Sequence, residues 1–409
     1  MRVSHLALSD YRSYSDVVLE FPAGVVAFLG RNGRGKTNLI ESLAYVGSLS
    51  SHRGSSPTNL VRVSPEGDQP GGAVIRARIE SERRSDLLEL EIARGRPNRA
   101  RLNRAKVAPR EIVGRLRAVV FAPEDLSLLR DQPEVRREFL DQVAVKVKPH
   151  HLGTLQEMQR VLRQRSAHLK MLQKNVGGSA SDRAVLDIWN EQLAELSSEV
   201  VAHRLAVSRA LTPLAERAYT AITDADRKAG LSYRSTAFGS GSDFPELSLS
   251  VEEGRFQGSA DPFVGEATQA YLRMFQERRD SEIARGVNLV GAHRDDLAIT
   301  LDDLPVRGFA SHGEVWSTAL ALRLAEAELL KTENEPPVLM LDDVFAELDE
   351  SRRRGLVSSI ADYDQVLITV AVGGDLPEEL SPSVFEVTRN SSGLSEVRPA
   401  GGRSRGKHD

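Results

Sequence analysis

Eight residues near the N-terminus have the types and the spacing of a loop that binds phosphate groups. Residues 30–37 read GRNGRGKT and fit the pattern G-x-x-x-x-G-K-[ST]. Glycines permit backbone angles and close approaches that a side chain would block, so successive backbone N–H groups can point inward at an anion. The pattern assigns Lys36 to the β- and γ-phosphates of a nucleotide and Thr37 to Mg²⁺. The predicted nucleotide-binding residues are Gly30, Arg31, Asn32, Gly33, Arg34, Gly35, Lys36 and Thr37.

A second stretch, VLMLDDVFAELD at residues 338–349, supplies the acids that such a site needs. Asp342 ends an apolar run and is predicted to hold Mg²⁺ through water. Asp343 follows it and is predicted to orient or deprotonate an attacking water. Two acids after a strand more often form a turn and a helix cap, and the phosphate-binding loop elsewhere in the chain is what favours the catalytic interpretation.

The elements around these residues predict an α/β fold. GVVAFLG is a continuous apolar run, typical of a strand buried on both faces, and KTNLIESLAYVGSL has the pattern of a helix. From about residue 124 to 286 apolar residues recur at helical spacing, and after 286 the alternation of strands and helices returns. We therefore expect residues 1–123 and 287–400 to form one α/β head that carries the phosphate-binding loop and the acidic strand, residues 124–286 a helical arm, and residues 401–409 a disordered tail.

The composition excludes several classes of protein. The 409 residues are 40 % hydrophobic and 27 % charged, an ordinary globular composition. Cysteine is absent, which rules out disulfides, cysteine-ligated zinc and thiol catalysis, and fits a reducing cytoplasm. No apolar run has the length of a signal peptide or a membrane span, so we expect a cytoplasmic protein. The nine histidines show no H-E-x-x-H or similar metal-ligand spacing.

Basic residues gather between positions 94 and 117, although the net charge of the chain is −4. Glu111 is the only acid in that run. Lysine and arginine contacts to phosphates give DNA binding that is independent of sequence and sensitive to salt. The alternation of the run suits a solvated β-strand face equally well, so both interpretations stay open. The candidate DNA-binding residues are Arg99, Arg101, Arg104 and Lys106, together with Arg53 after the first helix.

A second anion site is predicted within ASHGEVWSTALALRLAE, residues 310–326. It combines the hydroxyl of Ser311, the amide of Gly313 and a helix N-terminus. This loop, placed before the acidic strand, resembles the signature loop of ABC-type ATPases. The resemblance implies that Ser311 and Gly313 meet the γ-phosphate bound by a second chain, so that ATP is sandwiched in a homodimer and Ser311 shares in catalysis. AELD, residues 346–349, resembles the loop that crosses the same interface, which adds Asp349 to the site.

Over essentially its whole length the sequence resembles the RecF family of bacterial recombination mediators. The resemblance rests on GRNGRGKTNLIES, VVFAPEDLSLLRDQPEVRREFLD, VLRQRSAHLK, GAHRDDL and LMLDDVFAELD. It implies an ABC-type P-loop ATPase head with an inserted, mainly helical arm, and a weak ATPase that dimerises around ATP and Mg²⁺. It also implies binding to double-stranded, gapped or single-stranded DNA. With RecO and RecR, such proteins help to load the RecA recombinase in DNA repair, in recovery of replication and in the SOS response.

Some positions depart from the patterns of these families. His312, Val315 and Trp316 stand where the RecF signature commonly has two glutamines and an arginine, so contacts made by those side chains are not expected here. Asp343 is shorter than the glutamate of many ABC-type ATPases, and slow hydrolysis is expected. Val370 stands where many relatives carry a histidine that senses the γ-phosphate.

Other interpretations share part of this evidence. The ATP-driving subunit of a transporter has the same signature loop, but the long helical insert before that loop argues against it. An SMC-like structural ATPase needs a long coiled coil, and no sustained heptad is visible. A metabolic P-loop kinase would have no use for the signature loop. Residues 291–297 read GAHRDDL, with Ala292 in place of a usual proline. For this segment, a turn cap with a buried salt bridge is favoured over a metal or acid–base site.

Overall fold

The chain folds into two compact units. The first comprises Met1–Asp125, Ala218–Asp226 and Leu320–Asp409, and the second comprises Leu126–Arg217 and Arg227–Ala319. The computed structural model describes residues 1–51, 53–54, 56–63, 70–82, 84–175, 178–223, 227–240, 244–331 and 335–400. The expected disordered tail, residues 401–409, lies outside the described residues.

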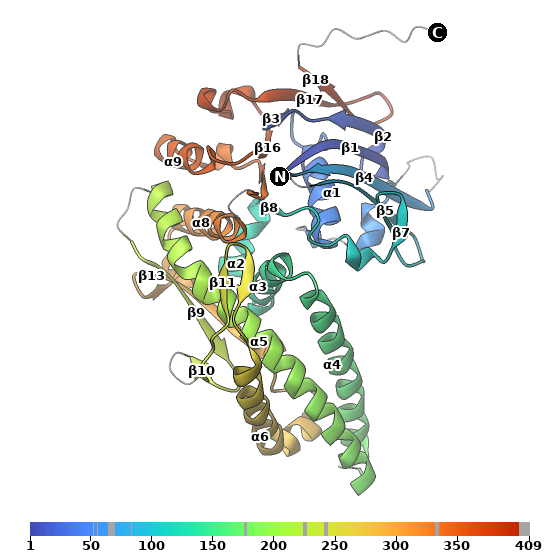
Figure 1. Cartoon of the computed structure of the whole chain (residues 1–409), viewed down its shortest axis with the longest axis vertical. Coiled ribbons are helices and arrows are strands. Elements are labelled where there is room, and N and C mark those ends of the chain that lie inside the picture. The colour runs from blue at the N-terminus through green and yellow to red at the C-terminus, as the bar shows by residue number, and fades with distance from the viewer. Residues whose placement is uncertain are drawn as a thin grey trace. The chain divides into compact units, whose positions relative to one another are not determined.

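A mainly parallel six-stranded sheet forms the centre of the first unit (Figure 1). The strand order is β18-β17-β3-β16-β15-β8, and only the edge strand β18 is antiparallel to its neighbour. Every residue of β15 and β16 is buried because helices cover both faces of the sheet. One face is covered by α1 (Lys36–Ser48), and the other by α9 (Glu350–Ile360) and the second half of α8 (His312–Leu330) (Figure 1). The strands are β3 (Gly24–Leu29), β8 (Ala118–Phe121), β15 (Val338–Asp342), β16 (Gln365–Val370), β17 (Ser383–Arg389) and β18 (Ser395–Pro399).

The first unit also holds an antiparallel sheet in the order β2-β1-β4-β5-β6-β7. Buried and less buried residues alternate along β4 and β5, as expected when one face of a sheet packs on the core. Leu39, Ile40 and Leu43 of α1 belong to a hydrophobic core that includes residues of both sheets. The strands are β1 (Arg2–Tyr11), β2 (Tyr14–Glu20), β4 (Gly72–Glu80), β5 (Ser85–Ala93), β6 (Arg99–Leu102) and β7 (Ala105–Val107). Short 3-10 helices connect these elements: η1 (Pro57–Leu60), η2 (Pro109–Glu111), η3 (Pro123–Leu126), η5 (Phe345–Glu347), η6 (Gly373–Asp375) and η7 (Glu378–Leu380).

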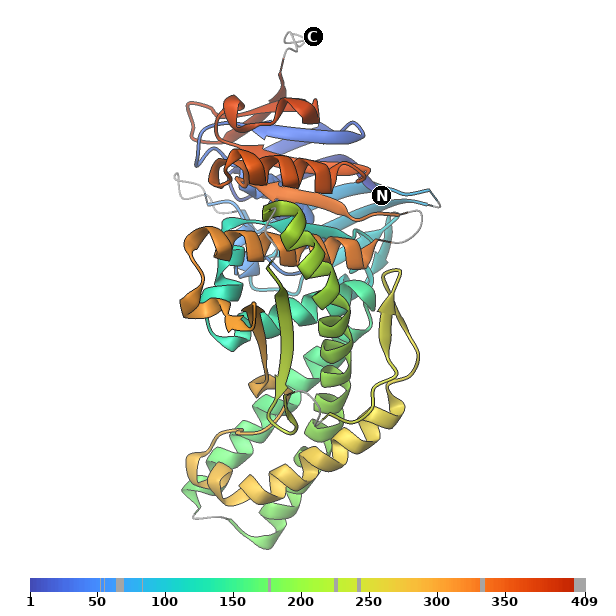
Figure 2. The ribbon, with the colours of Figure 1, turned by 90° about the vertical axis from the view of Figure 1, so that its left-hand side faces the viewer.

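The second unit is mainly helical. α4 (His151–Lys174) and α5 (Ala180–Thr223) form a hairpin whose tip packs against the end of α6 (Asp261–Arg285) (Figure 2). The buried side chains at this tip are Leu169, Leu172, Leu186 and Ile283. The shorter helices are α2 (Ser127–Arg130), α3 (Pro133–Val147), η4 (Ala292–Arg294) and α7 (Val306–Phe309).

Two small antiparallel sheets complete the second unit. One has the order β10-β9-β13-β14, and the other is a β11–β12 hairpin that lies beside α5 (Figures 1 and 2). The ring of Phe256 in this hairpin packs against that of His203. Because β13 pairs with β9, residues 287–319 group with the arm, and the boundary expected at residue 286 lies inside the second unit. The strands are β9 (Ala229–Ser235), β10 (Gly239–Ser240), β11 (Ser250–Glu252), β12 (Arg255–Gln257), β13 (Asp296–Leu301) and β14 (Leu304–Pro305).

A buried ion pair joins two helices of the second unit. Arg165 of α4 and Glu282 of α6 are both 0 % exposed, and Nη2 of the arginine lies 2.5 Å from the carboxylate. Arg165 also donates to Oδ1 of Asn190 and of Asn288, so its guanidinium is satisfied without water. Within the described residues, no helix combines the length and apolar character of a membrane span.

Candidate nucleotide-binding site

The predicted phosphate-binding loop connects β3 to α1 in the first unit. Gly33 has a φ of 75° and Gly35 a φ of 111°, angles that favour glycine. A Cβ atom on Gly35 would lie 2.5 Å from Oγ of Ser395, and one on Gly30 would lie 2.2 Å from the carbonyl oxygen of Val387. The course of the loop therefore depends on glycine at these positions, and it leads into the N-terminus of α1, where backbone N–H groups favour an anion.

Lys36 is the first residue of α1, and only 3 % of its side chain is exposed. Its Nζ donates to the carbonyl oxygen of Gly30 at 2.7 Å and to Oδ1 of Asn32 at 3.2 Å. The same ammonium group lies 3.7 Å from Oδ1 of Asp343. Lys36 thus stands between the loop and the acidic strand, where its charge can balance the terminal phosphates of a nucleotide.

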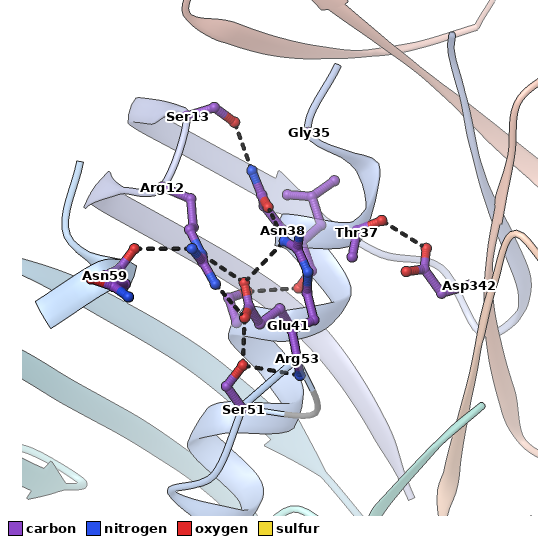
Figure 3. Close-up of polar contacts among 12 residues, drawn as sticks. Arg12, Ser13, Gly35, Thr37, Asn38, Glu41, Ser51, Arg53, Asn59 and Asp342 are labelled. Atoms are coloured by element: carbon purple, nitrogen blue, oxygen red, sulfur yellow. Dashed lines mark hydrogen bonds and ion pairs between the residues drawn. The ribbon is translucent and has the colours of Figure 1, made fainter. Parts of the chain in front are cut away.

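Thr37 and Asp342 come together from distant parts of the chain (Figure 3). Oγ1 of Thr37 donates a hydrogen bond of 3.1 Å to Oδ1 of Asp342, which also accepts one of 2.5 Å from Oγ1 of Thr369. The contact between Asp342 and Thr369 follows from the register of the sheet, in which these residues of β15 and β16 are paired. Adjacent hydroxyl and carboxylate oxygens are the donors that Mg²⁺ prefers, so these residues fit the predicted metal site.

Asp343 has a strained backbone and a carboxylate directed toward the loop. Its φ of 51° lies in the left-handed region, which is uncommon for a residue other than glycine. The backbone N–H donates to Oγ1 of Thr369 at 2.9 Å, and the side chain is 30 % exposed. The N-cap of the following η5 is Val344, and no side chain caps it. Asp343 therefore does not cap the following helix, which was the alternative interpretation of the two acids.

Glu41 is a buried acid behind the loop that the sequence interpretation missed. It is 0 % exposed, and its carboxylate accepts two hydrogen bonds from Arg12, of 2.6 and 2.8 Å, and one of 2.6 Å from Ser51 (Figure 3). Burial lowers the pKa of Arg12, but its hydrogen bonds and charge pairing with Glu41 hold that pKa above its usual value. The sequence did contain a signal for this role of Glu41: it is an acid one helical turn after Thr37, in a helix that is otherwise largely apolar.

Other side chains brace the loop and border a pocket beside it. The hydroxyl of Tyr14 donates to the carbonyl oxygen of Gly35 at 3.1 Å, and Oγ of Ser395 donates to that of Arg34 at 2.5 Å. Arg31 and Arg34 line a pocket of 380 Å³ together with residues 386–389 at the end of β17. The pocket has the size of a small-ligand site and adjoins the phosphate loop.

The signature loop belongs to the second unit, where Ser311 precedes α8. Its backbone N–H and Oγ donate to Oε2 of Glu314 at 2.7 and 2.8 Å, forming a capping box. Hydrogen bonds from Ser311 are the main reason that the pKa of Glu314 lies below its usual value. Ser311 is exposed, while Gly313 is half-buried in the first turn of the helix. The hydroxyl is thus at the surface, and the Glu314 carboxylate occupies the donors of Ser311 at the N-terminus of α8, so the anion site stays a prediction.

The altered signature positions fill structural roles. Val315 and Trp316 are 6 % and 4 % exposed and pack in the interior, so they cannot reach a ligand at the surface. Nδ1 of His312 lies 2.9 Å from Nη2 of Arg130 on α2. Asp349 is the N-cap of α9 in the first unit, accepting a hydrogen bond of 2.9 Å from the backbone N–H of Arg352, and its side chain is 57 % exposed.

Comparisons with known proteins decide the family. The profile described as RecF/RecN/SMC N terminal domain matches residues 2–393. DNA replication and repair protein RecF of Streptomyces avermitilis is 42 % identical over 394 residues, covering 96 % of this chain and 99 % of the relative. The protein of the same name from Beutenbergia cavernae is 45 % identical over 407 residues, covering 95 % and 98 %. The chain belongs to the RecF family.

Solved structures confirm the expected α/β fold of an ABC-type ATPase. The recombination mediator protein RecF-ATPrS in the RecFOR pathway has a TM-score of 0.80 at 23 % identity, covering 97 % of this chain and 98 % of that one. The corresponding RecF-ATP structure has a TM-score of 0.79 at 22 % identity, covering 97 % and 99 %. The Smc head domain derived from Pyrococcus furiosus has a TM-score of 0.52 at 16 % identity, covering 97 % and 95 %.

The middle of the basic run, residues 99–107, forms the β6–β7 hairpin at the edge of the antiparallel sheet. Arg99 and Arg101 are exposed, but Arg101 lies 2.7 Å from Glu89 and Arg99 lies 3.9 Å from Glu91 on the neighbouring strand. Burial raises the pKa of Glu89, yet its arginine partners hold that pKa below the usual value. Arg104 and Lys106 are exposed and form no ion pair with any described residue. The positive charge of the hairpin is therefore concentrated at its turn and on β7.

Arg53 lies close to the phosphate loop rather than on a separate surface. Its guanidinium is 3.4 Å from Oδ1 of Asn38 on α1 and 3.9 Å from Glu41 (Figure 3). It also lies 3.7 Å from Glu124. The side chain is 38 % exposed, so it can contact both the nucleotide region and solvent.

Residues 291–297 form a buried polar turn. Asp295, which is 1 % exposed, accepts hydrogen bonds from the hydroxyl of Tyr233 and from the backbone and hydroxyl of Thr236. Asp296 is paired with Arg136 of α3 at 2.8 Å. These contacts agree with the favoured interpretation of a turn with a salt bridge, although the Asp296 side chain is 32 % exposed and the bridge is only partly buried. His293 is neutral in this setting, because burial lowers its pKa to about 4.

Proposed function

We propose that this protein is a RecF-type recombination mediator, a weak ATPase whose ATP-dependent dimerisation controls its binding to DNA at single-strand gaps. The observation that carries the proposal is the convergence of Lys36, Thr37, Asp342 and Asp343 in one unit of a chain that belongs to the RecF family. The related structures described as RecF with ATP in the RecFOR pathway support the choice of nucleotide and process.

Different residues of the first unit would bind the phosphates, bind Mg²⁺ and activate the attacking water. Backbone N–H groups of the loop and the charge of Lys36 would hold the phosphates. Thr37 and Asp342 would hold Mg²⁺, which neutralises the charge that develops on the phosphates. Asp343, at the end of the same strand, would orient the attacking water and accept its proton. The pocket next to Arg31 and Arg34 gives room for the nucleoside part outside the phosphates.

A complete catalytic site is proposed to need two copies of the chain. Ser311 is exposed and precedes α8 with Gly313 in the first turn, which suits contact with a γ-phosphate held by another copy, and the exposed side chain of Asp349 is assigned to the same contact. In this chain Ser311 donates its hydroxyl hydrogen to Glu314, so that bond must be exchanged when a phosphate is bound.

For DNA, the proposed contacts are Arg53 and the β6–β7 hairpin, with Arg104 and Lys106 carrying charge that no described carboxylate neutralises. The partners proposed from the family are gapped, double-stranded or single-stranded DNA, RecO and RecR, with RecA as the recombinase that is loaded. The processes are DNA repair, replication restart and the SOS response, and the proposed location is the cytoplasm.

The test of this function is RecA assembly on gapped DNA in the presence of RecO and RecR. With ATP, the wild-type protein should shorten the lag before RecA filaments form, and Lys36→Ala should not. The same lag with and without the wild-type protein would contradict a mediator role.

A further inference from the structure

Two histidines and a glutamate converge on one point of the second unit. His151 begins α4, while Glu199 and His203 are one turn apart on α5 and therefore share a helix face. One possible ligand atom from each of the three residues lies within 4.8 Å of the other two. His151 and His203 are 1 % and 3 % exposed, and their ring centroids are 4.4 Å apart.

His151 has the properties of an unused metal ligand. Neither of its ring nitrogens has a hydrogen-bond partner among the described residues, although the ring is buried. Buried polar groups without partners are rare, because each one loses its bonds to water on folding. A neutral imidazole whose ring nitrogen is free of other bonds is the form that binds a metal ion.

The protonation of His203 is fixed by its own helix. Its Nδ1 lies 2.8 Å from the backbone carbonyl oxygen of Glu199, which can only accept a hydrogen bond. Nδ1 must carry the proton, so Nε2 has the free lone pair. A histidine whose second nitrogen donates to a backbone carbonyl is the usual arrangement behind a metal ligand, because it fixes both the ring and the tautomer.

Glu199 supplies the negative charge of the three residues, and a hydrogen bond orients its carboxylate. Oγ1 of Thr154 on α4 donates to its Oε1 at 3.0 Å. Lys148 also lines the cavity, and its positive charge opposes a cation here. Arg204 is neutralised by Asp141, whose Oδ1 lies 2.6 Å from Nε.

An open cavity adjoins this cluster. It has a volume of 1030 Å³, and both Glu199 and His203 are part of its lining. A ligand set of two histidines and a glutamate leaves one position of a tetrahedral ion for water or another small ligand. The cavity would provide access to that fourth position.

We propose that His151, Glu199 and His203 bind a Zn²⁺ ion that ties the start of α4 to α5 and keeps its fourth position toward the cavity. At metal–ligand distances of about 2.0–2.1 Å, tetrahedral ligands are about 3.4 Å apart, so modest side-chain rotations from the present separations complete the site. Imidazole donors favour zinc over Mg²⁺ and Ca²⁺, which take oxygen ligands. The site lies within the second unit and does not depend on the proposed nucleotide chemistry.

The first test titrates the chelator-treated, tag-free full-length protein with ZnCl₂ by calorimetry. Wild type should bind one Zn²⁺ with a Kd below about 1 μM. Glu199→Gln keeps the oxygen that accepts from Thr154 but removes the charge, and it should weaken binding by at least about 10-fold. The matched control Glu195→Gln changes a carboxylate on the same helix and cavity, and it should bind as wild type does.

Two further measurements identify the ligands. X-ray absorption at the zinc edge should show a nitrogen and oxygen shell at about 2.0–2.1 Å with the pattern of imidazole. His151→Phe keeps a buried ring without nitrogens and should lose the tight binding while its circular dichroism spectrum stays that of wild type. The proposal is overturned if wild type binds zinc no tighter than Glu199→Gln, or if the bound ion has oxygen ligands alone.

Discussion

Replacing Asp342 by asparagine separates metal binding from structure at the nucleotide site. In the wild-type protein Oδ1 of Asp342 accepts hydrogen bonds from Thr369 at 2.5 Å and from Thr37 at 3.1 Å. Asparagine is the same size and keeps an oxygen for both hydroxyl donors, but it is a much poorer partner for a divalent cation.

The effect on folding should be small because two terms oppose each other. A hydrogen bond to a charged acceptor contributes about 1.5–3 kcal/mol and one between neutral groups about 0.5–1.5 kcal/mol, so two bonds lose roughly 2–3 kcal/mol. Asp342 is only 3 % exposed, and removing its charge relieves a desolvation cost of several kcal/mol. We expect the midpoint of thermal unfolding without nucleotide to stay within about 2 °C of wild type.

The effect on the metal should be large. Loss of one oriented partner of a bound metal typically lowers metal affinity by about 10–100-fold, equivalent to about 1.4–2.8 kcal/mol. Titrating Mg²⁺ at fixed ATP, with fluorescence of a nucleotide analogue as the readout, should show half-saturation shifted upward by that factor. An unchanged Mg²⁺ requirement in a variant that folds normally would refute the role given to Asp342.

Three other changes test the remaining parts of the site. Asp343→Asn should abolish ATP turnover while ATP still binds, and a steady-state phosphate assay that finds normal turnover would exclude Asp343 as the group that orients and deprotonates the attacking water. Ser311→Arg should block ATP-driven dimerisation in sedimentation analysis without loss of ATP binding; a variant that still dimerises argues against the sandwich. Replacing both Arg104 and Lys106 by glutamate should weaken DNA binding and reduce its salt dependence. Replacing Arg398, which is exposed on β18, by glutamate should not. If both variants changed DNA affinity equally, the hairpin would not be part of the DNA-binding surface.

The nucleotide loop and the acidic strand could be predicted because each is encoded locally. The glycines that require positive φ, the apolar run of β3 and the start of α1 lie within one short stretch. The contact between Thr37 and Asp342 follows from a general property of parallel sheets, in which loops and acids at the carboxyl ends of neighbouring strands meet at one edge.

Features that depend on distant pairing could not be read from the sequence. The boundary at residue 286 was placed where helical spacing ended, but β13 pairs with β9 and brings residues 287–319 into the second unit. The role of Glu41 depends on Arg12 and Ser51, which come from separate loops. Both are products of tertiary contacts rather than of local pattern.

The histidine cluster was missed for a similar reason. A search for metal-ligand spacing tests residues on a single helix, whereas His151 comes from the start of α4 and its companions from the middle of α5. The pairing of Glu199 and His203 at i and i+4 was the available signal, and it becomes informative only when the third residue is placed beside them.

The central claim is that the nucleotide site controls binding to DNA. The direct measurement is fluorescence anisotropy of a labelled gapped duplex, titrated with the protein with and without Mg²⁺ and ATP, for wild type and for Lys36→Ala. The account predicts salt-sensitive binding that appears or strengthens with ATP in wild type and does not respond to ATP in the variant. Equal affinity of the wild-type protein under both conditions would contradict it.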